Sequence, residues 1–454
     1  MIGRDNPDWE GAAYYTIRTD PPTPVRLKCG GGREAFKHGP SADWVLTESV
    51  AFKEARAEID EGAAFLTSPH YKVIVGIRGS QPPTKESHAN GAESVVFNFD
   101  EGQGRVMLAF SRDKERVVLL TGLDGANGRK AVAEYYAALL GGSQIDTPEQ
   151  AMDDAFRAAV LCLEYCWYAP YGWIEGIHHW VSMFHMQHTP AAQWCGQADR
   201  SRDCIVSHGE LAFPNGAIPH LLPGGRTARH FSGHNQFYFW EVAEYWKHTA
   251  DRDTLEKLAP ALDRALGLTF TENDPDRDLL LGWGLQIGNQ EDFIATPYNG
   301  SVPTIEGINM MRARATVARA LGDEETARSM DARIRQAKAD LRSELWMNDL
   351  GRFMYYEDPA GNARLDGQYQ TCIYPVIDDI VDPLDAWTSM RHLRDRLTGA
   401  NGEVYLSNNF PDHLVEIFAT WGMQAGAAQQ PWGAWGLAAM GLRNETWRPL
   451  NAIS

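Results

Sequence analysis

The sequence has no long apolar run, few cysteines and a deficit of basic residues. No uninterrupted apolar stretch reaches the roughly 18 residues that a membrane-spanning helix needs, so we expect the protein not to associate with a membrane. The first residues, Met1 to Asp8, lack the basic segment and apolar core of a cleaved secretion signal. These two features predict a soluble protein and favour the cytoplasm.

Six cysteines in 454 residues are too few for a disulfide scaffold. Cys162 and Cys166 lie one helical turn apart, which suits two thiols better than a bridge within one helix. Cys195 and Cys204 flank a polar segment and are the only pair with plausible spacing. The sequence therefore favours reduced thiols.

The scarcity of positive charge excludes one class of partner. The chain has 42 Lys and Arg against 60 Asp and Glu, a net charge of −18, and no basic cluster stands out. Binding a phosphate backbone needs clustered Lys and Arg, so we expect no nucleic-acid partner. The acidic balance suits a neutral or cationic substrate better than a polyanion.

The first part of the chain has the pattern of an all-β domain. Up to about residue 125, short β-branched runs alternate with Gly, Asp and Asn. This spacing predicts an antiparallel β-sandwich over residues 1–126. The expected strands include residues 71–77, 93–99, 105–110 and 116–120.

The rest of the chain is predicted to be helical. A linker helix is expected within residues 127–145, and from residue 146 to 454 long amphipathic helices return through short tips that carry Asp or Thr as caps. Examples are helices 237–247 with 254–268, and 306–320 with 324–345. Long Gly, Pro and aromatic loops separate the hairpins, and loops of that length are usually functional. The pattern indicates a helical toroid with its working face at the loop-rich end.

One loop carries the chemistry. Residues 278–306 place two adjacent carboxylates, Glu291 and Asp292, among Trp283, Gln286 and Gln290. Indole faces pack on sugar C–H surfaces, amides bind hydroxyls, and a carboxylic acid can protonate a glycosidic oxygen. A third carboxylate, Glu306, stands where a helix is expected to begin. The alternative interpretation is an ordinary turn with solvated acids.

Several further motifs accompany that loop. They are Asn215-Gly-Ala-Ile-Pro-His220, His234-Asn-Gln-Phe-Tyr-Phe-Trp240, Thr296-Pro-Tyr-Asn-Gly300, Ile305-Glu306, the helix that ends Leu321-Gly-Asp323, and Phe353 to Asp358 after Trp346. With them the chain resembles the six-hairpin glycosidases over roughly residues 146–454. The resemblance implies an α+β multidomain protein in which an N-terminal antiparallel β-sandwich precedes an (α/α)6 catalytic barrel. It points to no single family.

The resemblance also implies roles for individual residues. Such enzymes usually invert the anomeric centre with two carboxyl groups, and the general acid here would be Asp292 or Glu291. Glu306 resembles a carboxylate that contacts or supports the substrate. The general base commonly lies near the last helices, but residues 421–433 contain no acid. The nearest acids are Glu403, Asp412, Glu416 and Glu445, of which Glu416 and Asp412 are the candidates for the base.

Other residues are candidates for substrate binding. Loop aromatics suit sugar platforms, whereas Trp240 and Trp246, inside expected helices, are interpreted as core. The Gly-rich turn before residue 234 carries Arg226, Arg229 and histidines that suit hydroxyl, carboxylate or phosphate groups. The remaining candidates are Trp173, His230, His234, Tyr298, Asn299 and Trp432.

We predict neither a metal nor a cofactor. His178, His179, His185 and His188 have the spacing of metal ligands but no well-placed carboxylate completes them. Residues 273–278 superficially resemble a calcium loop without its spacing and closing Glu, so a capped turn is favoured. No nucleotide-binding glycine signature follows a predicted strand.

The sequence thus predicts a glycoside hydrolase that acts on a small glycoside or oligosaccharide end. Three alternatives remain open. A polysaccharide lyase would use His230, Arg229 and Tyr298 on a uronate, a phosphorylase would depend on phosphate, and a non-catalytic carbohydrate-binding protein would lack the base. All of them take a carbohydrate partner. The sugar, the linkage and the oligomeric state stay open.

Overall fold

The computed structural model divides the chain into two compact units, Met1–Gly141 (unit 1) and Gly142–Ser454 (unit 2). The structure describes residues 11–30, 36–37, 45–46, 54–69, 71–88, 91–123, 125–175, 180–181, 188–219, 222, 234–282, 296, 298–365, 369–405 and 429–452.

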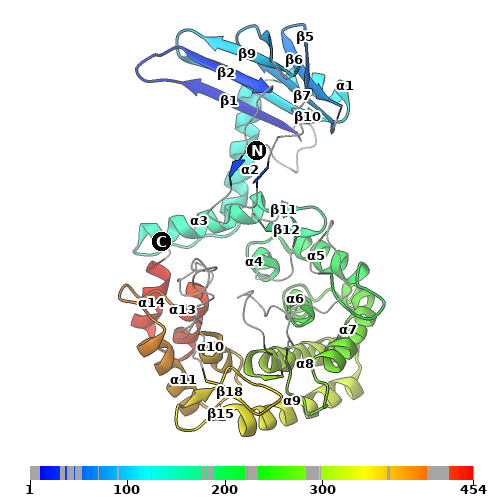
Figure 1. Cartoon of the computed structure of the whole chain (residues 1–454), viewed down its shortest axis with the longest axis vertical. Helices are drawn as coiled ribbons and strands as arrows, with labels where there is room; N and C mark the ends of the chain where they lie inside the picture. The colour runs from blue at the N-terminus through cyan, green and yellow to red at the C-terminus, as the bar shows by residue number, and fades with distance from the viewer. Residues whose placement is uncertain are drawn as a thin grey trace. The chain divides into compact units, whose positions relative to one another are not determined.

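Unit 1 contains two main antiparallel sheets (Figure 1). The larger has the strand order β1 (Ala12–Arg18), β10 (Gln103–Ser111), β7 (Tyr71–Gly79), β6 (Ala63–Ser68) and β5 (Arg56–Asp60). The smaller has the order β2 (Val25–Gly30), β9 (Glu93–Phe99) and β8 (Thr84–Ser87). A separate short pair is β3 (Phe36–Lys37) with β4 (Val45–Leu46).

The two main sheets enclose a shared apolar core. Leu66 and Ile77 of the larger sheet pack in one cluster with Val95, Phe97 and Phe99 of the smaller sheet. Residues that alternate along a strand point to opposite faces, so the odd-numbered positions of β9 reach this core together. The antiparallel sandwich predicted for this part of the chain is confirmed.

One predicted strand is wrong. Residues 116–120 belong to helix α1 (Lys114–Thr121), not to a strand. The Asp113 carboxylate accepts a hydrogen bond from the Glu115 backbone N–H, which starts the helix. Val117, Leu120 and Thr121 are buried, a helical spacing that covers the outer face of the larger sheet. Helix α2 (Gly125–Gly141) then lies where the linker helix was expected.

In unit 2 the helices follow one another around a ring (Figure 1). Toward its middle lie α4, α6, α8, α10 and α13, and around the outside lie α5, α7, α9, α11 and α14. The bounds are α3 (Gln150–Tyr165), α4 (His188–Trp194), α5 (Ala198–Glu210), α6 (His234–Thr249), α7 (Arg252–Glu272), α8 (Ser301–Leu321), α9 (Glu324–Leu345), α10 (Tyr369–Ile377), α11 (Pro383–Arg396), α13 (Gln429–Ala439) and α14 (Arg443–Asn451).

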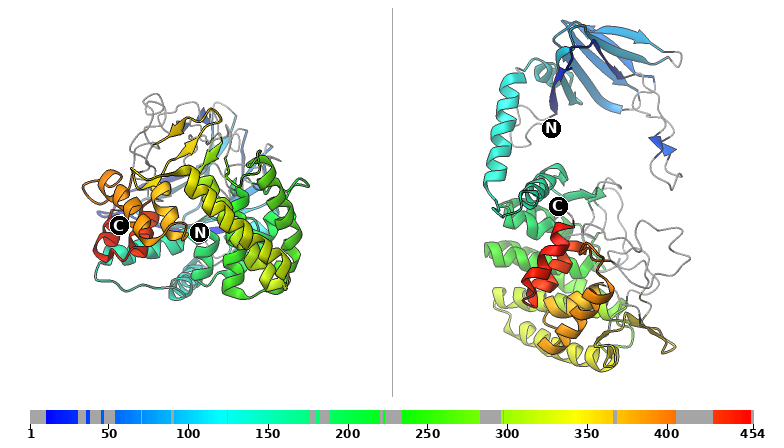
Figure 2. Two further views of the ribbon diagram at one scale, coloured as in Figure 1. Left: turned by 90° about the horizontal axis from the view of Figure 1, so that it is seen from below. Right: turned by 90° about the vertical axis from the view of Figure 1, so that its left-hand side faces the viewer.

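Short tips join each inner helix to the next outer one, and capping chemistry explains where the helices turn. Gly322 ends α8 in the left-handed conformation, with φ of 84°. Asp323 then caps α9 by accepting from the Thr326 N–H, and the two helices lie side by side (Figure 2). The guanidinium of Arg252, at the start of α7, donates to the Ala320 carbonyl at 2.6 Å and so holds two tips together.

Two apolar clusters fill the ring. Ile308, Met311, Ala315 and Ala318 recur at helical spacing along α8, and all four are buried. Small antiparallel strands lie before the inner helices or between hairpins. They are β11 (Trp167–Tyr168), β12 (Gly172–Glu175), β13 (Trp180–Val181), β14 (Asn299–Gly300), β15 (Trp346–Met347), β16 (Arg352–Phe353), β17 (Tyr356–Glu357) and β18 (Ala363–Arg364).

Two expectations about the whole chain can be compared with the structure. All six cysteines are free, as the sequence favoured. Among the residues that the structure describes, no helix combines the length and the apolar character that crossing a membrane requires.

Candidate functional site

The inner helices of unit 2 line a pocket of about 470 Å³, within the range of small-molecule sites. Its walls come from α6, α8, α10 with the tip that follows it, and α13. They combine aromatic rings, carboxylates and amides. The described lining residues are Gln236, Phe237, Trp240, Ala243, Glu244, Lys247, Glu306, Asn309, Arg312, Ala313, Thr316, Tyr374, Ile377, Asp378, Asp379, Trp432 and Trp435.

Helical spacing explains how α6 and α8 present these side chains. The lining positions recur every three or four residues along each helix, which places them on one stripe. The tips that follow α6 and α8 are neighbours, as the Arg252 contact shows, so the two helices end on the same side of the ring. We call the end near Gln236 and Glu306 the N-terminal end of the pocket, and the end near Lys247 and Thr316 its tip end.

The N-terminal end of the pocket is buried. Gln236 and Glu306 are only 3% and 5% exposed, and Phe237 follows Gln236 on α6. The rings of Tyr374 and Trp432, 5.5 Å apart, belong to the same pocket. The pocket therefore offers a carboxyl group, an amide and aromatic surface together, which is a composition that suits a sugar ring.

The tip end of the pocket is charged. The Arg312 guanidinium donates to the Asn309 side-chain oxygen at 3.1 Å and to the Asp378 main-chain carbonyl. The Lys247 ammonium forms an ion pair with Glu244. The Lys338 ammonium donates to the Asp379 main-chain carbonyl. The cations of this end are therefore already bound by neighbouring groups.

Burial raises the pKa of the Asp378 carboxyl to about 6. A hydrogen bond from Asn309 and the charges of Arg312 and Lys338 act in the opposite direction without cancelling it. At neutral pH this carboxyl is ionised, and it becomes protonated as the pH falls through about 6.

Next to the pocket, α4, α5 and α6 bury a polar cluster. Glu241 on α6 is fully buried, and desolvation raises its pKa well above the usual range against the opposing effect of Thr189 on α4. His208 on α5 is also fully buried, and desolvation lowers its pKa to about 4. Burial therefore favours the neutral form of both groups, and His208 is neutral at neutral pH.

Some of the expected site residues lie in the pocket and others do not. Glu306 and Trp432 line it. His234 is fully buried at the first residue of α6 and is not among the lining residues. Trp173 is 2% exposed, and its indole N–H donates to the Leu163 carbonyl at 2.9 Å. An indole buried in this way offers no face to a sugar, so the structure corrects the expectation for Trp173.

Tyr298 and Asn299 belong to a different group. The Tyr298 hydroxyl donates to the Asp276 carboxylate, and the Asn299 amide contacts Asp278 at 3.5 Å. In the same turn the Asp274 carboxylate accepts from the backbone N–H groups of Asp278 and Leu279. Three carboxylates approach one another there, but their oxygens accept hydrogen bonds, which fits the capped turn that the sequence favoured.

All four proposed catalytic residues lie outside the described residues. The same applies to several of the proposed substrate contacts and to other residues considered from the sequence. The residues concerned are Asp292, Glu291, Glu416, Asp412, His230, Trp283, Gln286 and Gln290, together with Arg226, Arg229, His178, His179 and His185.

Sequence reasoning missed several lining residues. Trp240, interpreted as core, is half-buried and lines the pocket, so that interpretation needs correction. The stripe of Gln236, Trp240, Ala243 and Lys247 was a readable signal for α6. Asp378 had no such signal, because it lies in a tip between two helices.

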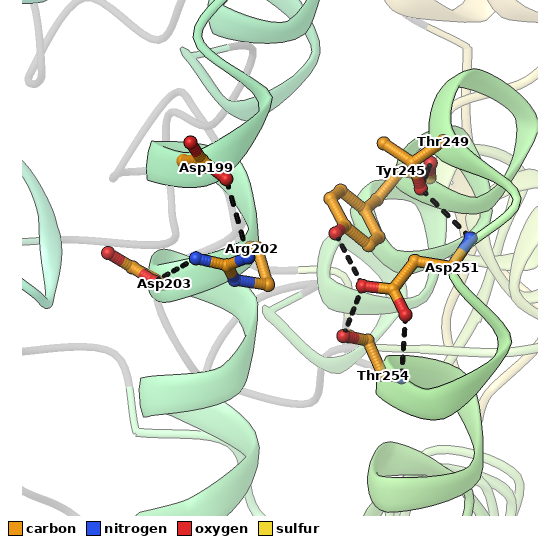
Figure 3. A network of polar contacts seen from close by, with 7 residues as sticks. All are labelled: Asp199, Arg202, Asp203, Tyr245, Thr249, Asp251 and Thr254. Carbon is orange, nitrogen blue, oxygen red and sulfur yellow. Dashed lines mark hydrogen bonds and ion pairs between the residues drawn. The ribbon is translucent and has the colours of Figure 1, made fainter.

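A polar network lies at the tip between α6 and α7, outside the lining of the pocket (Figure 3). Asp251 accepts from the Tyr245 hydroxyl at 2.8 Å and from the Thr254 hydroxyl at 2.6 Å. On α5, Arg202 forms ion pairs with Asp199 and Asp203. We assign this network to the stability of the hairpin, since its carboxylates bond to groups of the helices themselves.

Comparison with solved structures identifies the fold. The chain is similar to a rhamnosidase from Klebsiella oxytoca with rhamnose bound, with a TM-score of 0.53 and 13% identity over 95% of this chain and 86% of that one. A GH78 rhamnosidase of Bacillus sp. GL1 gives 0.55 and 10%, over 89% and 43% of the two chains. A GH63 mannosylglycerate hydrolase from Thermus thermophilus, in complex with glucose, gives 0.52 and 14%, over 65% and 89%.

These three proteins are glycoside hydrolases of the six-hairpin, (α/α)6 superfamily. At identities of 10% to 14% the similarity establishes the fold and not the reaction. No family model matches the sequence, and no curated protein matches it.

Proposed function

We propose that this chain, which has the six-hairpin glycosidase fold, is a glycoside hydrolase. It would cleave a small glycoside or the end of an oligosaccharide by general acid and base catalysis, with inversion at the anomeric carbon. The single observation that carries this proposal is the aromatic and carboxyl-lined pocket inside the helical ring. The glycoside hydrolases with the same fold support it by analogy.

The N-terminal end of the pocket would bind the sugar that is released. Glu306 and Gln236 offer a carboxyl group and an amide to hydroxyls, and Trp432 offers an aromatic face. Because Glu306 is almost fully buried, a hydroxyl that pairs with it would do so away from water, where hydrogen bonds are stronger. We propose Glu306 as a substrate-binding residue, and we assign the proton transfers to other groups.

The reacting carboxyls would come from residues beyond the described part of the site. Asp292 or Glu291 would protonate the glycosidic oxygen as the bond breaks. Glu416 or Asp412 would remove a proton from the attacking water on the opposite face of the sugar. An inverting pair of this kind needs the two carboxyls roughly 6.5–9.5 Å apart, which leaves room for the water.

One observation bears on the lyase alternative. A lyase acting on a uronate would have used Tyr298, but its hydroxyl donates to Asp276, and that contact together with burial raises its pKa to about 12. Tyr298 is also absent from the described lining of the pocket. The described contacts of Tyr298 therefore give no support to its proposed role in a lyase.

The test is a panel of aryl glycosides and oligosaccharides, including rhamnosides, mannosides, mannosylglycerate and glucosides. Asp292→Asn and Glu291→Gln are compared with the wild type, and proton NMR at early times reads the configuration of the released sugar. We expect one of the two variants to lose at least about a hundredfold in kcat/KM, and the product to have the inverted configuration.

Glu306→Gln tests the substrate-binding role. We expect kcat/KM to fall at least about tenfold, through the loss of a buried hydrogen bond to the sugar. The matched control is Glu272→Gln, the same change at an exposed position that ends α7. The proposal of hydrolysis is wrong if both loop variants keep full activity, if products absorb in the ultraviolet as unsaturated sugars do, or if turnover requires phosphate.

A further inference from the structure

We propose that the tip end of the pocket is a second carbohydrate-binding site, distinct from the N-terminal end to which catalysis is assigned. It would take a neutral sugar or polyol. The site is formed by Trp240, Trp435, Glu244, Asn309 and Asp378. The inference concerns binding at this end and does not depend on the proposed hydrolysis.

The two ends of the pocket differ in their exposure to solvent. At the N-terminal end, Gln236 and Glu306 are 3% and 5% exposed. At the tip end, the side chains of Lys247 and Asp379 are 55% and 96% exposed. The described walls therefore lead from a buried end to a solvent-accessible end on the side of the hairpin tips. A ligand can reach the tip end without passing the N-terminal end.

The far parts of the two ends are separated by more than one sugar ring. Gln236 at the N-terminal end and Glu244 of the second site are eight residues apart on α6, which corresponds to about 12 Å along a helix. Trp240 and Asn309 lie between the two ends, one helical turn from Gln236 and Glu306. A cavity of about 470 Å³ has room for more than one ring, so occupation of one end leaves the other available.

Aromatic surface is available at the second site. Trp432 and Trp435 stack with ring centroids 5.3 Å apart and an interplanar angle of 19°. Trp435, one helical turn nearer the tip, is 47% exposed. Trp240 on α6 is half-buried and lines the same cavity. These rings supply apolar faces of the kind on which sugar C–H surfaces pack.

Charge pairing at the tip end selects a neutral ligand. The Lys247 ammonium is matched by Glu244, and Arg312 donates to Asn309 and to the Asp378 main-chain carbonyl. An anionic ligand would have to displace these partners and would also meet the Asp378 carboxylate. A neutral polyhydroxyl compound can instead donate to Glu244 and Asp378 and accept from Asn309. Hydroxyls of a sugar meet this mixed set of groups without an unpaired charge.

The experiment measures sugar binding by saturation-transfer NMR and by equilibrium dialysis. The probes are D-glucose, D-mannose and L-rhamnose, with D-glucuronate as the anionic comparison. The variant Glu306→Gln disables the N-terminal end, and Trp435→Ala disables the tip end. Trp194→Ala is the matched control, because Trp194 is 60% exposed on α4 and does not line the pocket.

We expect Glu306→Gln to retain binding of at least one neutral sugar, and Trp435→Ala to weaken that binding at least about tenfold. Trp435→Phe should restore most of the affinity, since it keeps an aromatic face, and this variant separates lost stacking from a folding defect. Trp194→Ala should bind as the wild type does.

Four results would overturn the second site. The first is an equal loss of binding in Glu306→Gln and Trp435→Ala, which would indicate a single site, and the second is undiminished binding in Trp435→Ala. The third is binding of D-glucuronate as tight as that of the neutral sugars. The fourth is no binding of any of the three neutral probes. Hydrolysis is read separately from product release. Failure of the second site would therefore leave the proposed function standing, and failure of hydrolysis would leave the binding measurement interpretable.

Discussion

At the scale of the single residue, Asp251 shows how much one carboxylate does at a hairpin tip. It caps α7 by accepting from the Thr254 N–H at 3.1 Å and the Thr254 hydroxyl at 2.6 Å. It also accepts from the hydroxyl of Tyr245, near the end of α6, at 2.8 Å. The Thr254 hydroxyl contributes most to holding the pKa of Asp251 below its usual range. One side chain thus links both helices of a hairpin.

We expect Asp251→Ala to lower the free energy of unfolding by about 1 to 2 kcal/mol, because it removes the cap and leaves the Tyr245 hydroxyl without this acceptor. Asp253→Ala, an exposed acid in the same first turn, is the control and should cost less than about 0.5 kcal/mol. Urea unfolding measures both. A larger loss in the control would contradict the assignment.

The sign of the pH dependence follows from the lowered pKa. An acid whose folded pKa lies below its unfolded value stabilises the fold above the unfolded pKa. That contribution is lost as the pH falls through the folded pKa. The difference in stability between wild type and Asp251→Ala should therefore be largest near neutral pH and shrink in acid.

Single residues also show what the sequence could predict. Asp or Thr caps were expected at both tips, and Asp251 and Asp323 each accept a backbone N–H of the helix that follows. Local chemistry determines a cap, so a few residues suffice. Trp173 is the opposite case. Its loop position suggested a sugar platform, but whether an indole faces a cavity or the core depends on residues far away in the sequence.

At the scale of the element, two helical glycines illustrate how closely the helices of unit 2 approach their neighbours. A Cβ atom at Gly307, on α8, would lie 2.3 Å from the Leu281 Cδ1 atom. A Cβ atom at Gly267, on α7, would meet no atom within 4 Å. Glycine therefore permits a close approach on α8, and on α7 no contact requires it.

The same substitution should have opposite effects at the two sites. Gly267→Ala should raise the free energy of unfolding by about 0.5 to 1 kcal/mol, since alanine is the better helix former. Gly307→Ala should lower it by about 1 to 3 kcal/mol, because Leu281 must move. Chemical denaturation of the two variants provides the measurement. A gain in stability at both sites would show that helix propensity dominates, and a loss at both would contradict the prediction for Gly267.

Periodicity explains which elements could be predicted. Strands β7 and β9 and helices α7, α8 and α9 were found close to their observed bounds, because each carries a clear period of two or of 3.6 residues. The run Arg116-Val-Val-Leu-Leu120 is too short to distinguish the two periods, and its β-branched residues favoured a strand. The Asp113 cap and packing on the sheet decided for a helix.

At the scale of the whole molecule, buried imidazoles connect global stability to pH. Desolvation lowers the pKa of His208 to about 4 and that of His392, a half-buried residue of α11, to about 4. The unfolded chain binds a proton at each of these residues near pH 6.5, and the folded chain does not. The free energy of unfolding therefore falls as the pH drops from about 6.5 towards 4.

We expect the free energy of unfolding of His208→Gln to depend less on pH in this range than that of the wild type. The residue is fully buried, so its titration accounts for at most about 3 kcal/mol across that range. Urea unfolding at several pH values between about 7 and 5 compares the slopes, which separates the titration from any constant loss caused by the substitution. A slope equal to that of the wild type would exclude His208 as a source of the acid sensitivity.

The whole-molecule view also shows why only part of the site could be predicted. The helical ring was expected from the hairpin texture. Glu306 was expected in the site at the start of a helix, but α8 begins at Ser301, so Glu306 lies in the second turn. Arg312 and Asp378 belong to different hairpins and are neighbours. Their contact could not be predicted, because spacing along a chain does not show which hairpins are adjacent around a ring. Loop acids such as Asp292 stay a prediction.

The pairing of β1 with β10 has a consequence for biosynthesis. Ala12 is the register partner of Ala109, so the first strand cannot find its neighbour until roughly a hundred residues have left the ribosome. The helical hairpins of unit 2 close over tips of a few residues, and such local contacts form rapidly. In the nascent chain the side of β1 that will pair with β10 therefore stays unpaired until β10 has been made. We expect a chaperone to bind this exposed strand and prevent its aggregation.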